Sequence, residues 1–440
     1  MATSSSFRDT LVKAYTQIRR FFACLALFVL CAGADRAALA QQTEAPPVSA
    51  VEPGVLWLLN LGVGQGYNDD PLGTGKGGYF TEFDPVLDFS QDRPHGSWSL
   101  DFQPMVRRFY NFSVADQVNE MASTRDSWQM SRRWEIDLNG SYVHTSDPFF
   151  NGESPSGAQA VSTSGVVAPN DAFLGPEAAY TDFAGSSTIH FQAGRYTELT
   201  FGGDYFGNRE AVSGLSNSSS YAFRGGYTRM VHRGQTIGLL YSAQSFTVTD
   251  PGEQVTTNSL LLSYDFEWKT GRQLQLFAGP QYSQVSANIS NLGGPSLPLA
   301  INQNVLGYSA GAILSLVITK QNYLQLMASR RISNGAAVSG VTIQDEGQLN
   351  LSRRFSKRLT ASVGALYSEY QAVGSLPVAL PNGWGAFNRA QFNIDPRSAI
   401  SIEYDYFHQS QISSALAPLF SDNRALIEYH YSFGSLARQR

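Results

Sequence analysis

Segments in which apolar and polar residues alternate recur along this chain from residue 55 to its end. An alternation with a period of two gives a β-strand one apolar and one polar face. The pattern is clearest in residues 55–67, 133–142, 259–268, 358–368, 400–406 and 425–433. No segment after residue 40 sustains the period of 3.6 that indicates an amphipathic helix. The sequence therefore predicts an all-β fold.

The lengths of the predicted strands and the positions of their aromatic residues separate two kinds of β protein. Alternation alone also fits a soluble sandwich or propeller, whose strands usually have about 5–6 residues. The strands here are about 9–12 residues long, which is the length that crosses a bilayer at a tilt. Aromatic residues stand near strand ends on the apolar face, where the interfacial girdles of a membrane barrel lie. They include Trp98, Tyr110, Trp134, Tyr142, Trp268 and Tyr367. Both features favour a transmembrane antiparallel up-and-down β-barrel.

Tight turns that carry Lys or Arg punctuate the chain, and longer loops separate them. The eight turns are residues 92–96, 131–133, 193–195, 232–235, 270–272, 319–322, 356–358 and 395–398. Short turns at one end and longer loops at the other are typical of outer-membrane barrels. Eight hairpins, one strand before them and one after them give about eighteen strands, with sixteen as the alternative. The alternation is weakest in residues 116–130 and 180–191.

The first forty residues have the plan of a secretory signal peptide. Basic residues (Arg8, Lys13, Arg19 and Arg20) precede an apolar run over residues 21–34, and Ala38-Leu39-Ala40 forms a small-x-small cleavage site. The run is shorter than the roughly 20 residues of a membrane-spanning helix, which disfavours the alternative of an N-terminal anchor. We therefore expect a signal peptide over residues 1–40, a periplasmic lead-in over 41–54, an outer-membrane barrel over 55–433 and a C-terminal tail over 434–440.

Removal of the signal peptide changes what chemistry the chain can perform. Cys24 and Cys31 both lie within it, so the remaining chain has no thiol for a disulfide, a metal site or a nucleophile. The forty residues carry five basic and two acidic side chains, so the rest of the chain has a net charge of about −8. Nucleic acids bind basic surfaces, and we expect no nucleic-acid partner.

The last predicted strand alternates aromatic residues, Tyr429, Tyr431 and Phe433. It resembles the C-terminal signature by which the barrel-assembly machinery recognises its clients, except that residues 434–440 extend past the phenylalanine. With the basic turns, it makes nearly all of the chain after the signal peptide similar to bacterial outer-membrane β-barrel proteins of the porin type. The resemblance implies a barrel in contact with outer-membrane lipid. Many porins are homotrimers, so a homotrimer is one expected assembly. The resemblance indicates no substrate.

A barrel of this size is wide enough for an aqueous lumen, and fewer than fifteen residues precede the first strand after the signal peptide. That is too little for the plug of a TonB-dependent transporter. We expect a porin-like channel for passive or weakly selective diffusion of small hydrophilic solutes. The longest loop, residues 144–178, is the third outer loop, and our hypothesis is that it folds into the pore. The alternatives are an export barrel for exopolysaccharide and a surface-exposed interaction or adhesion barrel.

Strand parity predicts which charged side chains line the pore, and lumen charges set the ion preference of a channel. The predicted inward residues are Asp88, Asp101, Arg107, Arg125, Asp137, Asp204, Arg224, Asp265, Arg389, Glu403 and Asp405. Acids slightly outnumber bases, so we expect a weak preference for cations. The alternative is that these residues form ion pairs across neighbouring strands, in which case the channel would have no ion selectivity. Only Phe109 and Phe277 emerge as inward aromatic residues, too few to indicate a path for sugars.

Arg108 falls on the lipid-facing side by the same parity. An arginine there costs roughly 2–4 kcal/mol at the middle of the bilayer and little near its surface. We therefore expect either that Arg108 lies at the outer rim or that a β-bulge at Pro104 redirects it.

No catalytic constellation emerges, and we expect neither enzymatic activity nor a cofactor. Outer-membrane lipid hydrolases carry a histidine base two residues before a serine that Asn-Gly follows. Ser333-Asn334-Gly335 matches the second part of this pattern, but Arg331 occupies the position of the histidine, so Ser333 has no adjacent base to activate it. The six histidines have no metal-binding spacing. The adjacent acids Asp69 and Asp70 are weak evidence for a calcium ion.

Overall fold

The structure is a computed structural model that describes residues 55–71, 76–111, 116–145, 180–210, 217–249, 253–269, 271–289, 299–333, 342–372, 382–410 and 420–434. The predicted signal peptide and lead-in lie outside these residues, as do residues 146–178 of the predicted pore loop and most of the predicted tail. The described part of the chain contains no helix long and apolar enough to cross a membrane.

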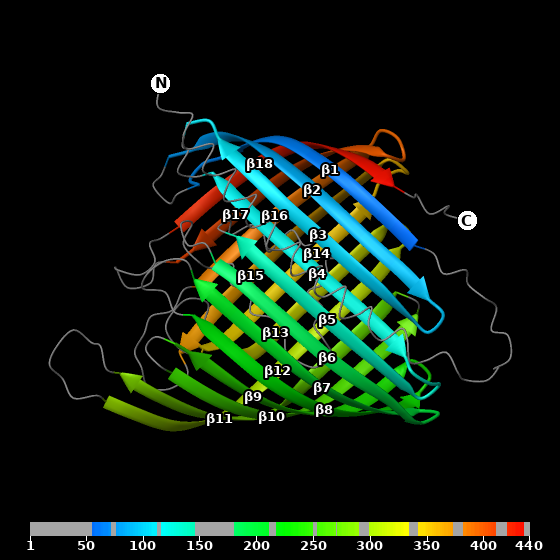
Figure 1. Cartoon of the computed structure of the whole chain (residues 1–440), viewed down its shortest axis with the longest axis vertical. Helices are drawn as coiled ribbons and strands as arrows, with labels where there is room; N and C mark the ends of the chain where they lie inside the picture. The colour runs from blue at the N-terminus through cyan, green and yellow to red at the C-terminus, as the bar shows by residue number, and fades with distance from the viewer. Residues whose placement is uncertain are drawn as a thin grey trace, which may run out of the picture. The chain divides into compact units, whose positions relative to one another are not determined.

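Eighteen antiparallel strands form a single closed sheet (Figure 1). They are β1 (Val55–Asn68), β2 (Gly78–Arg93), β3 (Gly96–Phe109), β4 (Gln117–Gln129), β5 (Trp134–Thr145), β6 (Tyr180–Gly194), β7 (Thr197–Glu210), β8 (Ser218–His232), β9 (Gln235–Val248), β10 (Glu253–Lys269), β11 (Arg272–Ile289), β12 (Leu299–Thr319), β13 (Asn322–Ser333), β14 (Thr342–Arg354), β15 (Leu359–Ala372), β16 (Asn382–Asn393), β17 (Ser398–Gln409) and β18 (Phe420–Gly434). Each strand pairs with its neighbours in sequence, and β1 pairs with both β2 and β18, which closes the barrel. The predicted fold class and strand number are confirmed.

The eight predicted tight turns join the hairpins from β2–β3 to β16–β17. They all lie at one end of the barrel, which we call the tight-turn rim, and the opposite end is the long-loop rim. Two of the turns contain a glycine with positive φ, Gly234 at 75° and Gly271 at 78°. That conformation is strained for residues with a Cβ, and the register shifts by one residue beside each of these glycines. Glycine therefore allows the backbone conformation of these two turns.

The strands are 12 to 21 residues long, so the predicted length of 9–12 residues was wrong. The longest are β10, β11 and β12, with 17, 18 and 21 residues. Near the long-loop rim their outward positions are polar, for example Asn258, Gln284 and Asn304. The lipid-facing band of a barrel is only about 25 Å tall, so strands can continue beyond it with polar residues on both faces. Such extensions resemble loops in the sequence.

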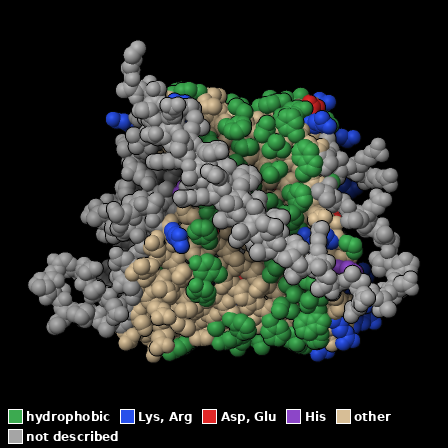
Figure 2. All heavy atoms as spheres, in the orientation of Figure 1, with side chains coloured by type: hydrophobic (Ala, Val, Ile, Leu, Met, Phe, Trp, Pro, Cys, Tyr) green, Lys and Arg blue, Asp and Glu red, His purple; other side chains and the backbone are tan. Residues whose placement is uncertain are grey.

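Large hydrophobic side chains are exposed on the outer face of the barrel, and Figure 2 shows them over much of the visible surface. Leu262, Leu306 and Tyr308 are examples from β10 and β12. β4 departs from this pattern, because its outward positions include Glu120, Thr124 and Asp126. This composition explains why its alternation was weak in the sequence.

Arg108 lies on the outward face, one residue before the end of β3 at the long-loop rim. The register is the same on both sides of Pro104, with Phe83 opposite Val106 and Leu87 opposite Phe102. There is therefore no β-bulge at Pro104. Of the two expectations for Arg108, the position at the outer rim is confirmed and the bulge is wrong.

Candidate functional site

The inward face of the barrel is the candidate functional site, and its two halves differ in burial. Near the long-loop rim, inward side chains such as those of Arg107 and Gln344 are buried. Near the tight-turn rim, inward side chains such as those of Asp88, Asp101 and Asp265 are only partly buried. We call these regions the long-loop half and the tight-turn half of the lumen.

Buried ion pairs characterise the long-loop half. Arg107 on β3 donates from Nε to Glu82 Oε2 on β2 at 2.7 Å and from Nη1 to Gln117 Oε1 on β4 at 3.0 Å. The side chains of Arg107 and Glu82 are only 1% and 3% exposed. The guanidinium also lies 4.7 Å from the ring centre of Phe80. This arrangement satisfies a charge that would otherwise be costly to bury.

Three further arginines in this half are paired in the same way. Arg424 on β18 bonds Asp405 on β17 through Nε at 3.0 Å and Nη2 at 2.7 Å. Arg224 on β8 forms an ion pair with Asp204 on β7.

The last of these arginines, Arg331 on β13, is held by β14. Its Nη2 lies 3.1 Å from Glu346 Oε2 and 3.2 Å from Gln344 Oε1. Arg331 is the residue that stands where a lipid hydrolase would need a histidine. Here it is part of an ion pair in the barrel wall.

Arg389 and Glu403 lie directly opposite each other on β16 and β17, toward the tight-turn ends of these strands, and form an ion pair. Glu403 is buried, whereas 42% of the Arg389 side chain is exposed. On β18, His430 Nε2 lies 3.0 Å from Glu428 Oε2 and 3.0 Å from Ser401 Oγ. Paired charges therefore continue into the tight-turn half on β16, β17 and β18.

Carboxylates dominate the tight-turn half. Asp88 on β2 and Asp101 on β3 are directly opposite each other, and Ser123 Oγ donates to Asp101 Oδ2 at 3.1 Å. Asp265 on β10 has no hydrogen-bond or ion-pair partner within the described ranges. Among the residues described, Arg125 donates to a neutral group, Asn139 Oδ1, at 3.3 Å. Two like charges side by side raise the local negative potential, which attracts cations.

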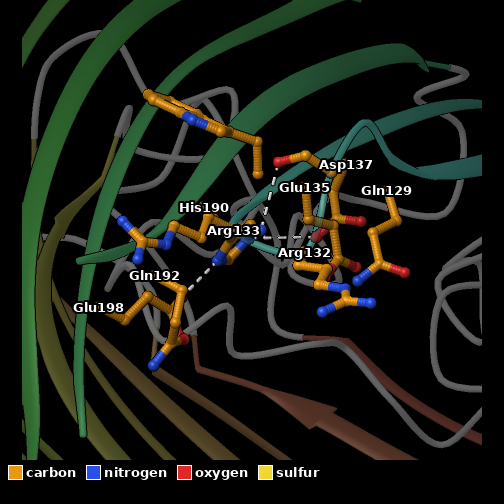
Figure 3. Close-up of a pocket in the computed structure, with 10 residues that line it drawn as sticks. Gln129, Arg132, Arg133, Glu135, Asp137, His190, Gln192 and Glu198 are labelled. Carbon is orange, nitrogen blue, oxygen red and sulfur yellow. Dashed lines mark hydrogen bonds and ion pairs between the residues drawn. The ribbon is translucent and has the colours of Figure 1, made fainter. Parts of the chain in front are cut away.

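A pocket of about 250 Å³ lies in the tight-turn half, between β4, β5, β6 and β7. Figure 3 shows His190 of β6 at its centre, between the carboxylates of Asp137 and Glu198. His190 Nε2 is 3.1 Å from Asp137 Oδ2, and Nδ1 is 2.6 Å from Glu198 Oε1. The imidazole therefore bridges the two carboxylates. The pocket is also lined by Arg132 and Arg133 of the adjacent turn.

Aromatic residues of the lumen lie flat against the wall, over glycines of the neighbouring strand. A Cβ added to Gly66, Gly311 or Gly364 would overlap with the ring of Phe80, Phe277 or Phe387, respectively. Because these glycines have no side chain, the rings occupy the wall rather than the interior.

More aromatic residues face inward than Phe109 and Phe277, the two identified from the sequence. The others include Phe80, Phe206, Phe246, Tyr370, Phe387 and Phe407. Most of these six are buried. They supply packing, and they present little ring surface to a passing solute.

All eleven charged residues that parity placed inward lie on the face opposite the exposed apolar side chains. The structure brings together Asp88 with Asp101, Asp204 with Arg224, and Arg389 with Glu403. The missed residues are mainly partners of the predicted ones. They are Glu82 for Arg107, Arg424 for Asp405, and His190 with Glu198 for Asp137. Each of them has inward parity, so the available signal was the face of its strand.

The described part of the chain contains no group of three His, Cys, Asp or Glu side chains arranged to hold a metal ion. Asp69 and Asp70 instead contact β18: Asn423 Nδ2 donates to Asp69 Oδ2 at 2.5 Å, and the Asp70 amide donates to Asp422 Oδ1 at 3.3 Å. These contacts link the long-loop ends of β1 and β18.

Three solved structures from Pseudomonas aeruginosa are among those similar to this chain. OccK2 (OpdF) is 12% identical, with 87% of this chain and 98% of that chain covered and a TM-score of 0.43. OpdL is 10% identical, with 87% and 99% covered and a TM-score of 0.41. The siderophore receptor PirA is 11% identical, with 87% and 81% covered and a TM-score of 0.41. Matches at this identity and TM-score show neither the family nor the solute of this barrel. No protein-family model and no curated protein matches the chain.

Proposed function

We propose that the protein is an outer-membrane channel through which small hydrophilic solutes diffuse. The observation that carries the proposal is the tight-turn half of the lumen, where Asp88, Asp101 and Asp265 face inward and are only partly buried. Ionised groups need water or a partner, so these carboxylates indicate an aqueous interior. An apolar outer face around that interior suits a bilayer.

Liposome swelling tests this proposal directly. Vesicles that contain the full-length protein are diluted into isotonic solutions of sugars of increasing size. We expect rapid swelling with small sugars and a cut-off as the sugar size rises. A barrel that gives no swelling with any of them, although correctly folded, would contradict the channel.

We further propose that the channel weakly prefers cations. The inward bases Arg107 and Arg224 are neutralised by Glu82 and Asp204, whereas Asp88, Asp101 and Asp265 have no arginine or lysine partner within the described residues. These three carboxylates outnumber the inward Arg125, which bonds a neutral amide. The remaining fixed charge of the lumen is therefore negative, and it raises the local concentration of cations.

Reversal potentials in a salt gradient measure this preference. We expect the variant Asp88→Asn, Asp101→Asn and Asp265→Asn to lose most of the cation preference while it still conducts. Glu369→Gln is the matched control, because Glu369 is an acid on the outward face of β15. Anion selectivity of the unmodified protein would refute the proposal, as would equal effects of the two variants.

The orientation of the barrel is part of this proposal, with the tight-turn rim in the periplasm. Because the chain after residue 40 contains no cysteine, a single cysteine can report on each rim. A membrane-impermeant maleimide applied to intact cells should label Lys76→Cys at the long-loop rim and leave Lys357→Cys unlabelled. The reverse pattern would overturn the orientation.

The export alternative needs a track of exposed aromatic rings on which sugars stack. The inward rings are instead mostly buried, or lie flat over glycines such as Gly311 and Gly364. The adhesion alternative depends on loops that lie largely outside the described residues. A diffusion channel is therefore the function that the described geometry supports best.

A further inference from the structure

We propose that the tight-turn rim binds the phosphate headgroups of a lipid leaflet. This proposal does not depend on what passes through the lumen. It starts from a ring of basic side chains, because every tight turn carries Lys or Arg at or beside it. Exposed examples away from the pocket of the lumen are Arg195, Arg233, Lys320, Arg353, Lys357 and Arg358. Figure 2 shows Lys and Arg along the right-hand edge, where Figure 1 places the tight turns.

Two of these arginines are positioned at the outer surface by aromatic rings. The guanidinium carbon of Arg195 lies 5.2 Å from the ring centre of Tyr196, and that of Arg353 lies 4.9 Å from the ring centre of Phe355. Tyr196 and Phe355 are themselves 51% and 53% exposed. Stacking on an exposed ring leaves the N–H groups at the edge of the guanidinium free to bind an anion. Planar guanidinium groups match the paired oxygens of a phosphate.

A girdle of exposed aromatic residues adjoins the basic ring on the outer face. It includes Trp57, Trp128, Trp134, Trp268, Phe392 and Phe433. Tryptophan rings prefer the depth of the membrane interface. The girdle would thus place the basic ring beside the lipid phosphates rather than in bulk water.

The acids close to this ring neutralise only part of it. Asp126 lies 3.8 Å from Arg93. Asp395 accepts hydrogen bonds from the amides of Arg397 and Ser398 at 2.7 and 2.9 Å. Three further acids near the tight turns, Asp92, Glu135 and Glu267, have inward parity and lie on the lumen side of their strands. The outer side of the rim therefore keeps a positive charge, which is complementary to anionic lipid.

The long-loop rim provides a comparison. There the outward Arg330 forms an ion pair with Asp345 at 2.8 Å, next to a further outward acid, Glu369. Arg330 thus has acidic neighbours that the cluster at Arg353, Lys357 and Arg358 lacks among the residues described. This difference in charge favours the tight-turn rim over the rim around Arg330 as the lipid-binding surface.

The test uses the folded full-length protein and lipid bilayers of two compositions. One consists of phosphatidylcholine and the other contains about 30 mol % phosphatidylglycerol, an amount that gives a strongly anionic surface. Native mass spectrometry counts the lipids that remain bound after mild detergent extraction. The rim variant carries Arg353→Gln, Lys357→Gln and Arg358→Gln. The control variant carries Lys76→Gln, Arg108→Gln and Arg209→Gln, which removes the same charge at the long-loop rim.

We expect the unmodified protein and the control to retain several-fold more phosphatidylglycerol than the rim variant, with equal phosphatidylcholine in all three. The conservative variant Arg353→Lys with Arg358→Lys should retain most of the binding, which separates lost charge from lost folding. Equal retention by the rim variant and the control would overturn the proposal. Displacement of the lipid by millimolar inorganic phosphate would also overturn it, because the rim would then be an ion site rather than a lipid site.

Discussion

In the long-loop half of the lumen, each inward arginine that the structure describes lies against a carboxylate, whereas in the tight-turn half, at β2 and β3, two carboxylates lie beside each other. The pair of Arg107 and Glu82 represents the first half, and the pair of Asp88 and Asp101 represents the second. Buried charges must be paired because an isolated one is costly, whereas charges in water need no partner. The same residue types therefore hold the wall together in one half and set the potential of the lumen in the other.

The largest expected effect comes from breaking a buried pair. Arg424 is 0% exposed and bonds Asp405 twice. Arg424→Met should lower the free energy of unfolding by about 3–5 kcal/mol, because Asp405 would stay buried without a counter-charge. Urea unfolding in lipid vesicles, followed by tryptophan fluorescence, measures this change.

The matched change in the other half is Asp101→Asn. It should leave the stability unchanged or raise it slightly, because it relieves the repulsion from Asp88 across the strand pair. If both variants lost the same stability, the distinction between a structural half and an electrostatic half would fail. The double variant Arg424→Gln with Asp405→Asn should recover part of the loss.

These pairs also show how far the sequence could predict the site. Parity alone places Glu82 and Arg107 on the inward face. The tight turn pairs Arg93 with Gly96, and counting back along both strands from that pair places Glu82 opposite Arg107. The sequence could therefore have identified Glu82 as the partner of Arg107. Asp405 and Arg424 are joined through a long loop, and no turn chemistry fixes their register. That pair needed the structure.

The same limit applies to strand length and to burial. Polar outward residues such as Asn258 and Asn304 continue β10 and β12 beyond a bilayer-sized band, and in the sequence they resemble loop residues. A period of two shows which face a side chain lies on. The period cannot show whether other side chains cover that side chain. Arg107 and Arg125 are therefore equivalent in the sequence pattern, although Arg107 is buried and Arg125 is exposed.

The next largest effect tests the glycine positions that keep rings out of the lumen. The methyl group of Gly364→Ala would overlap with the ring of Phe387 and should turn it inward. We expect a cost of about 1–3 kcal/mol and a lower single-channel conductance. Gly347→Ala is the control, because a Cβ there meets nothing within 4 Å. Unchanged conductance and stability in Gly364→Ala would show that the ring can move aside within the wall.

A smaller effect is expected from the pocket in the tight-turn half. His190 contacts Asp137 and Glu198, and Glu135 lies opposite it. His190→Ala leaves Asp137 and Glu198 without this partner and more open to the lumen, so the cation preference should rise slightly. Reversal potentials in a salt gradient measure the rise. His95→Ala, in an exposed turn, should leave the preference unchanged; an equal rise there would mean that the effect does not come from the pocket.

The smallest effect concerns a single turn at the tight-turn rim. The hydroxyl of Ser398 and the amide of Arg397 donate to Asp395 and lower the pKa of that carboxyl group. A carboxyl whose pKa is lower in the folded state stabilises the fold above its unfolded pKa of about 3.9 and loses this contribution as the pH falls. Asp395→Ala should therefore lower the melting temperature slightly at pH 7 and have less effect at pH 3. Asp92→Ala, an exposed acid beside another tight turn, is the comparison. An equal decrease at both pH values would mean that the turn geometry, rather than the charge of Asp395, stabilises this hairpin.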